Sequence, residues 1–344
     1  MKNPIKLGMV GIGRAGYGMH LAEMGDKGLY DIVAVCDLEA DRTAEMHEKY
    51  GSKQYSRVED IVEDPDVELI DIATRSNDHF IHAMTALQAG KAVLLEKPIS
   101  LTYDQAVELF AFAERCGKDK LFIRHNRRFE AKFIEVNKII ASGELGDIFY
   151  IKRCHTQFSR RADWQTLSQY GGGQLLNWGP HLIDQSLQFC GGDYKRMLSH
   201  TRLAAAAGDC EDVIFASFEG VNGRIVEMEI NCGSAIHMPE YIVYGTRGTL
   251  IDKGETYRIN HLPLDYEFSE IKASAHTPKR GASFGSNEVL PFVDEERTWE
   301  TNDLDHIWQY VYKTIREGAV YPIKSHEALK VMEVISEIKK QNKR

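Results

Sequence analysis

The 344-residue chain has no apolar run long enough to cross a membrane, because no stretch approaches roughly 18 consecutive apolar residues. It also has no excess of basic residues, since 42 Lys and Arg face 51 Asp and Glu and the formal net charge is −9. This balance disfavours nucleic acid and anionic membrane surfaces as partners. The first residues lead directly into an apolar segment, so we expect no signal peptide.

Cysteine is scarce and scattered. The six cysteines form no C-x-x-C pair, and Cys36 falls inside a predicted parallel strand, where a reduced apolar thiol is expected. We therefore expect no disulfide framework and a cytoplasmic location. His79 and His82 lie three residues apart without carboxylate or cysteine partners, which is typical of a helix surface. No metal is expected.

What the chain does have is a glycine-rich turn between an apolar segment and a helical pattern. Residues 5–10 are apolar, and the six residues after them are Gly11, Ile12, Gly13, Arg14, Ala15 and Gly16. In a G-x-G-x-x-G turn the first glycine permits the tight turn, the second lets the backbone approach a pyrophosphate, and the third lets the helix pack on the strand. A helix N-terminus also offers free N–H groups to phosphates. The segment therefore predicts a dinucleotide site.

An acidic residue follows at the distance that this site requires. The second predicted strand, residues 32–36, ends in Asp37, 21 residues after Gly16. A carboxylate there accepts hydrogen bonds from the adenosine ribose hydroxyls and repels a 2′-phosphate. Leu38 comes next, and Arg42 is interpreted as part of a solvated helix face. The predicted cofactor is NAD, with NADP less favoured.

Strands and helices alternate through the first third of the chain. Buried parallel strands have continuous apolar runs, so this alternation predicts a doubly wound parallel sheet, a Rossmann domain, over residues 1–124. Further strands are expected over residues 67–73, 92–95 and 121–123, and helices over 39–50, 79–89 and 102–116. Capping boxes are expected at Ser56-Arg57-Val58-Glu59 and Thr102-Tyr103-Asp104-Gln105.

The pattern changes near Arg124. After a helix over residues 130–142, longer strands follow one another, which predicts an α+β domain over residues 125–344 with a large, mostly antiparallel open sheet. Its strands are expected over residues 148–158, 196–205, 213–218, 224–231 and 241–251, with a hairpin at Asn222-Gly223. Helices are expected over residues 175–189, 303–317 and 325–340, and residues 256–300 are expected to be irregular. The C-terminal helix is a candidate to dock back on the first domain.

Glu96-Lys97-Pro98 follows the buried strand over residues 92–95. Ligands of doubly wound folds bind at the carboxyl ends of the strands, where Lys97 lies. A lysine at a buried strand end is costly unless it has a partner or a role. A structural salt bridge with Glu96 and a role in chemistry are equal alternatives for Lys97 taken alone.

A second candidate segment begins with three glycines, residues 171–173, and continues into a predicted helix. Asn177 and His181 are four residues apart on one face of that helix, and Asp184 is placed to orient the imidazole. Gly179 and Pro180 are unfavourable inside a helix, so the local distortion indicates a purpose. The alternative is that His181 is a core histidine with satisfied hydrogen bonds and the glycines form an ordinary loop.

Together these segments resemble the glucose–fructose oxidoreductase, inositol dehydrogenase and rhizopine-catabolism (Gfo/Idh/MocA) family of NAD(P)-dependent oxidoreductases. Four matches carry the resemblance: the Gly11 to Gly16 turn, Ala73-Thr74 leading to His79, Glu96-Lys97-Pro98, and Gly171-Gly172-Gly173 leading to His181. Their order and spacing span nearly the whole chain. The resemblance implies a Rossmann domain followed by a domain with a large open sheet that often serves oligomerisation.

The resemblance also implies roles for individual residues. Lys97 and His181 map to the catalytic lysine and histidine, Lys97 precedes a cis-proline, and Asn126-Arg127-Arg128-Phe129 matches a segment near the nicotinamide. The cofactor-binding set implied by the turn and the resemblance is Gly11, Ile12, Gly13, Arg14, Ala15, Gly16, Asp37, Ala73, Thr74, His79, Glu96, Lys97 and Asn126.

Two positions depart from the family pattern. Asn177 stands where most members have aspartate, and an amide orients a hydroxyl but does not stabilise the Lys97 ammonium as a carboxylate does. Arg75 stands where proline usually follows Ala-Thr. It either contacts a polar or acidic substituent of the substrate or points outward.

The residues before the glycine loop give clues to the substrate. Asp163, Trp164 and Gln165 combine a carboxylate, an indole and an amide, which suits a sugar ring, although Trp164 is equally interpreted as a core anchor. His155 lies on the strand that leads towards the loop. The predicted substrate-binding set is Asn177, Asp184, Trp164, Asp163, His155 and Arg127.

The expected function is NAD-dependent oxidation of a secondary hydroxyl of a sugar, glycoside or cyclitol. Hydride passes to the nicotinamide, His181 accepts the hydroxyl proton and Lys97 stabilises the oxygen. A redox-neutral NAD-dependent glycoside hydrolase is an alternative, although the histidine-rich motif associated with those enzymes is not evident. A non-enzymatic NAD and sugar sensor is another, disfavoured by the retention of Lys97 and His181. A homo-oligomer, dimer or tetramer, through the C-terminal sheet is expected from the resemblance.

Overall fold

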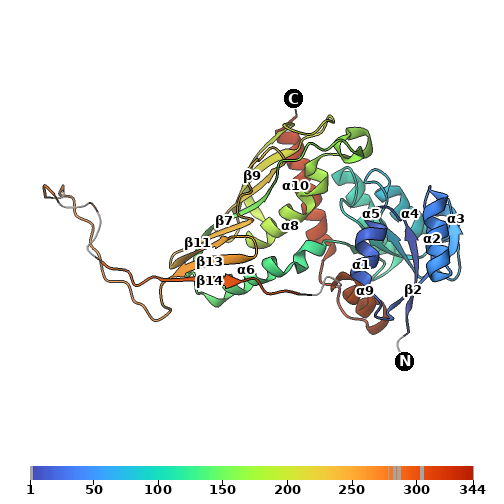
Figure 1. The fold of residues 1–344 in the computed structure, drawn as a ribbon, viewed down its shortest axis with the longest axis horizontal. Coiled ribbons are helices and arrows are strands. Elements are labelled where there is room, and N and C mark those ends of the chain that lie inside the picture. Colours follow the sequence, from blue (N-terminus) through green and yellow to red (C-terminus); the bar gives the residue numbers. More distant parts are fainter. Residues whose placement is uncertain (1–2, 278, 282–283, 285–287, 303–305, 344) are drawn as a thin grey trace.

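The computed structural model describes residues 3–277, 279–281, 284, 288–302 and 306–343. It contains a six-stranded parallel sheet in the N-terminal part of the chain and an eight-stranded, mostly antiparallel sheet in the C-terminal part (Figure 1). The predicted fold class is confirmed. The predicted division between residues 124 and 125 stays a prediction.

The parallel sheet has the strand order β3-β2-β1-β4-β5-β6. Its strands are β1 (Ile5–Val10), β2 (Tyr30–Cys36), β3 (Lys53–Tyr55), β4 (Leu69–Ile72), β5 (Ala92–Leu95) and β6 (Leu121–Ile123). The order reverses between β1 and β4, so a ligand crevice is expected at the carboxyl ends of these two strands. The edge strand β3 was not predicted, because a polar three-residue strand leaves no apolar run in the sequence.

Helices α1 (Ala22–Met24), α2 (Ala40–Tyr50), α3 (Val58–Val62), α4 (His79–Gln88) and α5 (Tyr103–Cys116) connect the strands. The predicted capping box at Ser56 is wrong, because α3 begins at Val58 without a side-chain cap. At α5, Thr102 Oγ1 accepts from Gln105 N at 3.3 Å as predicted. The Gln105 side chain accepts from Leu101 N instead of from Thr102 N.

The eight-stranded sheet has the order β14-β13-β12-β11-β7-β10-β9-β8, and β7 and β10 are its parallel pair. Its strands are β7 (Ile148–Thr156), β8 (Tyr194–Arg202), β9 (Val213–Gly220), β10 (Ile225–Asn231), β11 (Tyr241–Gly245), β12 (Gly248–Asp252), β13 (Thr256–His261) and β14 (Val293–Thr298). Figure 1 shows α6 (Ala131–Ser142), α8 (Gly179–Phe189) and α10 (Ser325–Gln341) together on one side of it.

The structure confirms one expectation for this sheet, contradicts a second and corrects a third. The hairpin at Asn222-Gly223 is confirmed between β9 and β10. The single strand over residues 241–251 is wrong, because the chain turns at Thr246-Arg247 and pairs β11 with β12. Residues 256–300 are not wholly irregular, since β13 and β14 lie within them. The polar side chains of β13 and of the edge strand β14 hid both strands from a prediction based on apolar pattern.

The last two helices return to the first domain. Helix α9 (His306–Glu317) places Trp308 against Tyr30 of β2, with ring centroids 5.1 Å apart, and the Tyr30 hydroxyl donates to the Trp308 carbonyl oxygen at 2.6 Å. Between α9 and α10, the Tyr321 hydroxyl donates to the carbonyl oxygen of Ile123 at 3.0 Å. Lys339 of α10 reaches the carbonyl oxygen of Leu101. Residues 303–305 of the predicted helix lie outside the described residues.

We expect Trp308→Ala to destabilise the protein by about 3–5 kcal/mol, because it empties a site where the indole is 1% exposed. The measurement is the free energy of unfolding from denaturant titration followed by circular dichroism. Val320→Ala, at a side chain that is 75% exposed, is the control and should change stability by less than about 0.5 kcal/mol. Equal effects of both changes would contradict the docking of α9.

Candidate functional site

The glycine turn after β1 has the geometry of a dinucleotide cradle. Gly11 has φ of +88°, and a Cβ on it would lie 2.7 Å from the carbonyl oxygen of Ala73. A Cβ on Gly16 would lie 2.1 Å from the carbonyl oxygen of Gly11. At Gly13 the nearest atom to an added Cβ is Arg42 Nη1 at 3.8 Å, so space for a ligand lies above the turn. These residues fit a pyrophosphate on the backbone.

The helical turn after the glycines, Gly16–Leu21, is π-helical rather than α-helical. The backbone N–H of His20 donates to the carbonyl oxygen of Ala15, five residues earlier, at 2.9 Å. This wide turn is not visible in the spacing of apolar residues. Its consequence is that His20 lies fully buried beneath the turn, between β4 and β5.

Asp37, which follows β2, accepts hydrogen bonds from the glycine turn and from its own loop. Its Oδ2 accepts from the N–H of Ile12 at 2.7 Å, and Oδ1 accepts from the N–H of Glu39 at 3.0 Å. Arg42 Nη1 lies 3.2 Å from Oδ1, and Arg42 is exposed on α2, as its interpretation as part of a solvated helix face expects. A carboxylate and a guanidinium thus stand together where the adenosine ribose is expected.

A buried ionic network lies beneath the crevice. His20 Nδ1 lies 2.8 Å from Asp71 Oδ2 on β4, and His20 Nε2 lies 3.0 Å from Glu96 Oε1 after β5. Arg124, which follows β6, donates to Glu96 at 2.6 Å and also pairs with Glu23. The sequence reading missed His20, Asp71 and Arg124, because the network exists only after four separate segments meet.

Lys97 is held at the top of this network. Its backbone N–H donates to Glu96 Oε2 at 2.9 Å, so the Glu96 carboxylate lies under the lysine. Its Nζ donates to the carbonyl oxygen of Asn177 at 3.0 Å and lies 3.4 Å from Asn177 Oδ1. The Lys97–Pro98 peptide bond is cis, as the resemblance implied. Lys97 therefore joins the parallel sheet to the second domain.

The expected helix-surface position of His79 is wrong, because the side chain is 2% exposed and supports the neighbouring loops. Its Nδ1 lies 2.6 Å from the carbonyl oxygen of Pro98, and its Nε2 lies 3.1 Å from that of Thr74. The Thr74 hydroxyl lies 3.1 Å from His82 Nδ1. These contacts connect the loop after β4 with the turn at the cis-proline, which fixes the wall of the crevice beside Ala73.

His181 comes from a helix that is broken in two. The predicted helix over residues 175–189 is divided at Trp178 into α7 (Gln174–Asn177) and α8, and Pro180 occupies the first turn of α8, where proline is tolerated. His181 is 7% exposed, and its Nδ1 has no hydrogen-bond partner among the described residues. A buried polar atom of this kind requires a ligand or a water.

Trp178 is the aromatic side chain at the centre of the site. The sequence analysis named Trp164, and not Trp178, as the candidate aromatic residue of the site. The His155 ring stacks on Trp178 with a centroid distance of 3.4 Å, and the guanidinium of Arg127 lies 4.1 Å from the centre of the indole. Trp178 also contacts His181 edge to face at 5.9 Å. This stacking joins residues that are far apart in the sequence, so residue spacing could not predict it.

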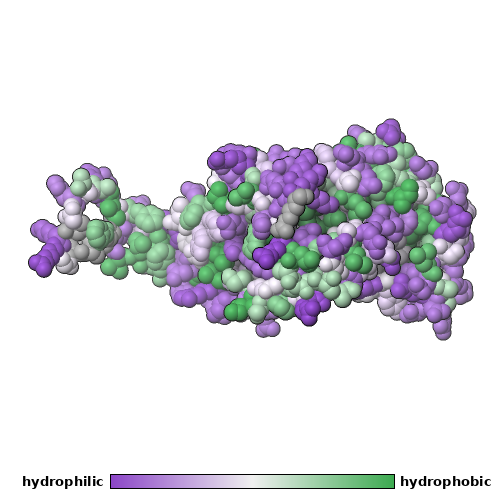
Figure 2. Space-filling model, turned by 90° about the horizontal axis from the view of Figure 1, so that it is seen from above, coloured by the Kyte–Doolittle hydropathy of each residue, from purple (hydrophilic) through white to green (hydrophobic). Residues whose placement is uncertain are grey.

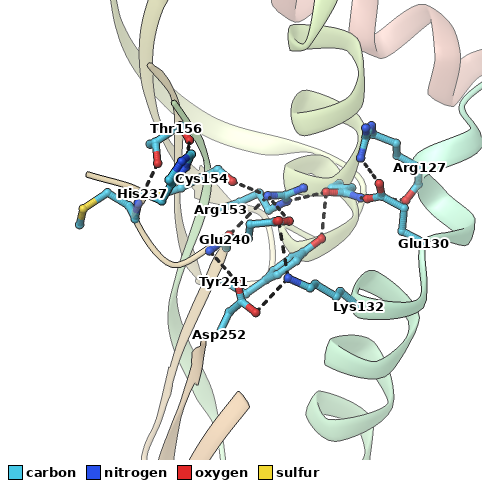
Figure 3. A network of polar contacts seen from close by, with 12 residues as sticks. Arg127, Glu130, Lys132, Arg153, Cys154, Thr156, His237, Glu240, Tyr241 and Asp252 are labelled. Carbon is cyan, nitrogen blue, oxygen red and sulfur yellow. Dashed lines mark hydrogen bonds and ion pairs between the residues drawn. The ribbon is translucent and has the colours of Figure 1, made fainter. Parts of the chain in front are cut away.

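A polar network anchors the strand that carries His155 (Figure 3). Arg153, 1% exposed and two residues earlier on β7, donates to Gln185 Oε1 of α8 at 2.7 Å. The carboxylate of Glu240 lies 3.6 Å from its Nη1. Gln185 Nε2 donates to the carbonyl oxygen of Arg127 at 2.8 Å. The network therefore fixes His155 and Arg127 relative to α8.

Other predicted side chains are engaged elsewhere. Asp184 accepts from Arg128 at 2.6 and 2.7 Å and does not orient His181 as expected, because Arg128 pairs with both Asp184 and Glu327. Asp163 caps the short turn Trp164–Thr166 and pairs with Arg161 at 2.7 Å. Trp164 is half-buried at the start of that turn. Asn126 Oδ1 is buried without a partner among the described residues.

Burial and charge set the protonation of the central side chains. Burial, together with the positive charges of Lys97 and Arg127, holds the pKa of His181 well below its usual value. Burial also lowers the pKa of Lys97, an effect that Glu96 opposes. Burial beside Arg153 lowers the pKa of His155 to about 3. Near pH 7 both imidazoles are therefore neutral.

The comparisons with known proteins agree with this geometry. Residues 5–125 match the oxidoreductase family with an NAD-binding Rossmann fold, and residues 133–251 match the GFO/IDH/MocA C-terminal domain. The chain belongs to the Gfo/Idh/MocA family of oxidoreductases. Its NAD-binding Rossmann domain carries the glycine turn, and the chain is an oxidoreductase.

Relatives of this oxidoreductase cover most of its length. The oxidoreductase YhhX of Escherichia coli is 30% identical over 288 residues, which cover 81% of this chain and 80% of YhhX. The scyllo-inositol 2-dehydrogenase (NADP+) IolW of Bacillus subtilis is 25% identical over 344 residues and covers 96% of this chain and 92% of IolW. Biliverdin reductase of Synechocystis, solved with biliverdin and NADP+, shares the fold with a TM-score of 0.77 at 21% identity, over 99% of each chain.

Two features are absent from the described residues of this oxidoreductase. Within residues 3–277 and the described segments after them, no group of three or more His, Cys, Asp or Glu side chains is arranged to hold a metal ion. In the same part of the chain, no helix has both the length and the apolar character of a membrane span.

We expect His20→Gln to reduce stability most at low pH. The carboxylates of Asp71 and Glu96 raise the pKa of His20 above its usual 6.5, although burial opposes them. The protonated ring therefore contributes stability that is fully present below about pH 6.5 and is lost as pH rises through the folded-state pKa. The difference in free energy of unfolding between wild type and His20→Gln, measured from pH 5.5 to 9, should shrink with rising pH; a difference that grows would contradict a charged His20.

Proposed function

We propose that this oxidoreductase is an NAD-dependent dehydrogenase that oxidises a secondary hydroxyl of a sugar, glycoside or cyclitol. The observation that carries the proposal is the pairing of Lys97 and His181 beside the glycine turn. His181 is buried and Lys97 is partly buried, and a neutral imidazole stands within the electrostatic field of an amine held by Asn177. IolW, a relative along nearly the whole chain, is a scyllo-inositol dehydrogenase, which supports a polyol substrate.

In the proposed reaction the bound NAD supplies a hydride acceptor, the C4 position of its nicotinamide ring. The neutral imidazole of His181 accepts the proton of the substrate hydroxyl, because its depressed pKa leaves it unprotonated near pH 7. Lys97 Nζ directs two N–H groups to Asn177, and the third donor of its ammonium form is free to bind the reacting oxygen. Lys97 thereby stabilises the charge that develops on that oxygen.

The surroundings of Trp178 favour polar contacts with the substrate. His155 and Arg127 both lie within 4.1 Å of the indole centre, so they take its two faces and leave no face for stacking on a sugar ring. Arg127, Asn177 and the neutral His155 then present hydrogen-bonding groups towards the substrate. Such groups suit a polyhydroxylated molecule.

Arg75 makes a further contact between the two domains, with Tyr170. It is exposed, and its guanidinium lies 4.9 Å from the centre of the Tyr170 ring in the second domain. This position favours a role at the boundary of the substrate crevice over an outward direction. The sequence alone left these two alternatives open.

Asp37 supports NAD as the cofactor over NADP. We expect Asp37→Ser to lower the ratio of kcat/KM with NAD to that with NADP by roughly tenfold or more, which equals about 1.4 kcal/mol. The substitution removes the carboxylate that repels a 2′-phosphate and frees Arg42, now 3.2 Å from Asp37, to bind that phosphate. Steady-state kinetics with both cofactors measure the ratio. If Asp37→Ser combined with Arg42→Ala shows the same ratio as Asp37→Ser, Arg42 has no part in the change.

Replacing Lys97 tests the reaction itself. With NAD and scyllo-inositol as probe substrate, Lys97→Met and His181→Asn should each lower kcat by roughly 10²–10⁴-fold, the usual contribution of a proton-transfer group. NAD binding, followed by fluorescence titration, should change little, because the glycine turn is separate. Lys118→Met, at an exposed lysine, is the matched control. Turnover that survives in both variants rejects the assigned roles.

A further inference from the structure

Arg75 lies where the loop after β4 meets the second domain. Its guanidinium is 4.9 Å from the centre of the Tyr170 ring, and Tyr170 immediately precedes the three glycines that lead towards His181. The two loops are in close contact, because a Cβ added to Gly171 would lie 3.2 Å from Ser76 Cβ. Arg75 is therefore beside the segment that brings His181 into the candidate site.

The contact with Tyr170 attracts the charge of Arg75 and uses none of its hydrogen-bond donors. An aromatic face binds a cation through its electron-rich ring, and a guanidinium in that position still has its five N–H groups in a fixed fork. Among the described residues, no carboxylate lies within ion-pair distance of the Arg75 side chain, and no oxygen accepts a hydrogen bond from it. The exposed guanidinium therefore has its donors free for a ligand.

Two arginines at the edge of the crevice, Arg14 and Arg75, have no acidic partner in the part of the chain that the structure describes. Other arginines around Lys97 and His181 form ion pairs within the chain. These pairs are Arg124 with Glu96, Arg127 with Glu130, Arg128 with Asp184, Arg153 with Glu240 and Arg161 with Asp163. Arg14 and Arg75 are thus free to pair with a bound ligand.

The cofactor accounts for Arg14. This residue belongs to the glycine turn, which fits the pyrophosphate of NAD, and a pyrophosphate brings negative charge to that turn. Arg75 instead contacts the second domain, which contributes Asn177 and His181 to the candidate site. The anion that pairs with Arg75 is therefore expected on the substrate.

The surroundings of Lys97 also favour a negatively charged substrate. Burial, followed by the positive charges of Lys97 and Arg127, holds the pKa of His181 well below its usual value. The nearby carboxylates of Glu96 and Asp184 are each paired with an arginine, so their charge is compensated. Hydrogen bonds to an ionised group are roughly twice as strong as neutral ones. An anionic group on the substrate therefore gains more from this site than a neutral hydroxyl does.

We propose that the substrate of this oxidoreductase is a sugar acid, a polyol that carries a carboxylate, and that Arg75 binds this carboxylate. The inference rests on the proposed dehydrogenase function and narrows its substrate class. In the bound substrate the carboxylate lies at Arg75, and a secondary hydroxyl lies at Lys97 and His181. The hydride of the carbinol carbon passes to NAD, the hydroxyl proton passes to His181, and the carboxylate is unchanged.

A carboxylate suits Arg75 better than a phosphate group does. One guanidinium matches the two oxygens of a carboxylate with two parallel N–H···O bonds. A phosphate ester has three acceptor oxygens and about −1.5 to −2 charge near pH 7, which is more than one guanidinium satisfies. In the described part of the chain, Arg75 is the one cation over the Tyr170 ring.

The test compares neutral polyols with the acids that share their carbon skeletons: glucose with glucuronate, galactose with galacturonate, and glucitol with gluconate. NADH formation gives kcat/KM for each compound with NAD, and calorimetric titration gives its Kd for the protein saturated with NAD. We expect at least one acid to exceed its neutral counterpart by roughly tenfold or more in kcat/KM.

Replacing Arg75 tests its part in this preference. Arg75→Met should lower the ratio of kcat/KM between the acid and its neutral counterpart by roughly tenfold or more, mainly through the KM of the acid. Arg75→Lys should recover part of the ratio, because it keeps the charge and loses the paired donors.

Arg280→Met is the matched control, since it removes an exposed arginine from the segment between β13 and β14. Figure 2 shows the described part of this segment standing clear of the body of the molecule, at the end opposite the Rossmann domain in Figure 1. The control should keep the acid preference of the wild type.

Two kinetic results overturn the sugar-acid substrate: no acid exceeds its neutral counterpart, or Arg75→Met leaves the preference intact. A loss of NAD affinity in Arg75→Met as large as its loss of acid affinity also overturns it, because Arg75 would then serve the cofactor. Preference for glucose 6-phosphate over glucuronate, removed by Arg75→Met, rejects the carboxylate.

Calorimetry separates this inference from the proposed function. Acids that bind the NAD-loaded wild type, bind Arg75→Met more weakly and are not oxidised would support the carboxylate site and reject the dehydrogenase. Oxidation of neutral polyols, with no acid bound more tightly than its neutral counterpart, would support the dehydrogenase and reject the site.

Discussion

The carboxylate of Glu96 is the contact on which the rest of the site depends. It receives His20 from the helix after β1, Arg124 from the end of β6 and the backbone N–H of Lys97. A buried carboxylate is tolerated only with such partners, and removal of one partner of a buried ion pair typically costs about 3–5 kcal/mol. Because these groups lie at the carboxyl ends of neighbouring strands, the same bonds that satisfy the charge also place Lys97 at the mouth of the crevice.

Side chains of the second domain complete the candidate site. Asn177 ends α7 and meets Lys97 through its carbonyl oxygen, and the break at Trp178 turns the chain so that His181 enters the crevice at the start of α8. His155 and Arg127, from two further segments, contact the indole of Trp178. Lys97 and His181, the proposed reactive pair, therefore come from the two domains, and burial near cations lowers the pKa of each.

The sequence predicts well those features that depend on neighbours along the chain. The strand and glycine turn, the hairpin at Asn222-Gly223 and the Thr102 cap follow from local geometry, and all are in the structure. Features that arise from contacts between distant segments were not predicted from the sequence. Asp184 has the helical spacing to meet His181 but pairs with the stronger partner Arg128, which approaches from another element. Trp178 likewise gains its place only when β7 meets α7.

The proposed reaction at the Lys97 and His181 junction is oxidation of a polyol with net transfer of hydride to NAD. The most direct measurement is NADH absorbance with NAD across free sugars, glycosides and cyclitols, with Lys97→Ala protein as the blank. NADH should form with at least one polyol and should be absent in the blank. Hydrolysis of a glycoside without net NADH, by protein that retains bound NAD, would contradict it and indicate a redox-neutral glycosidase.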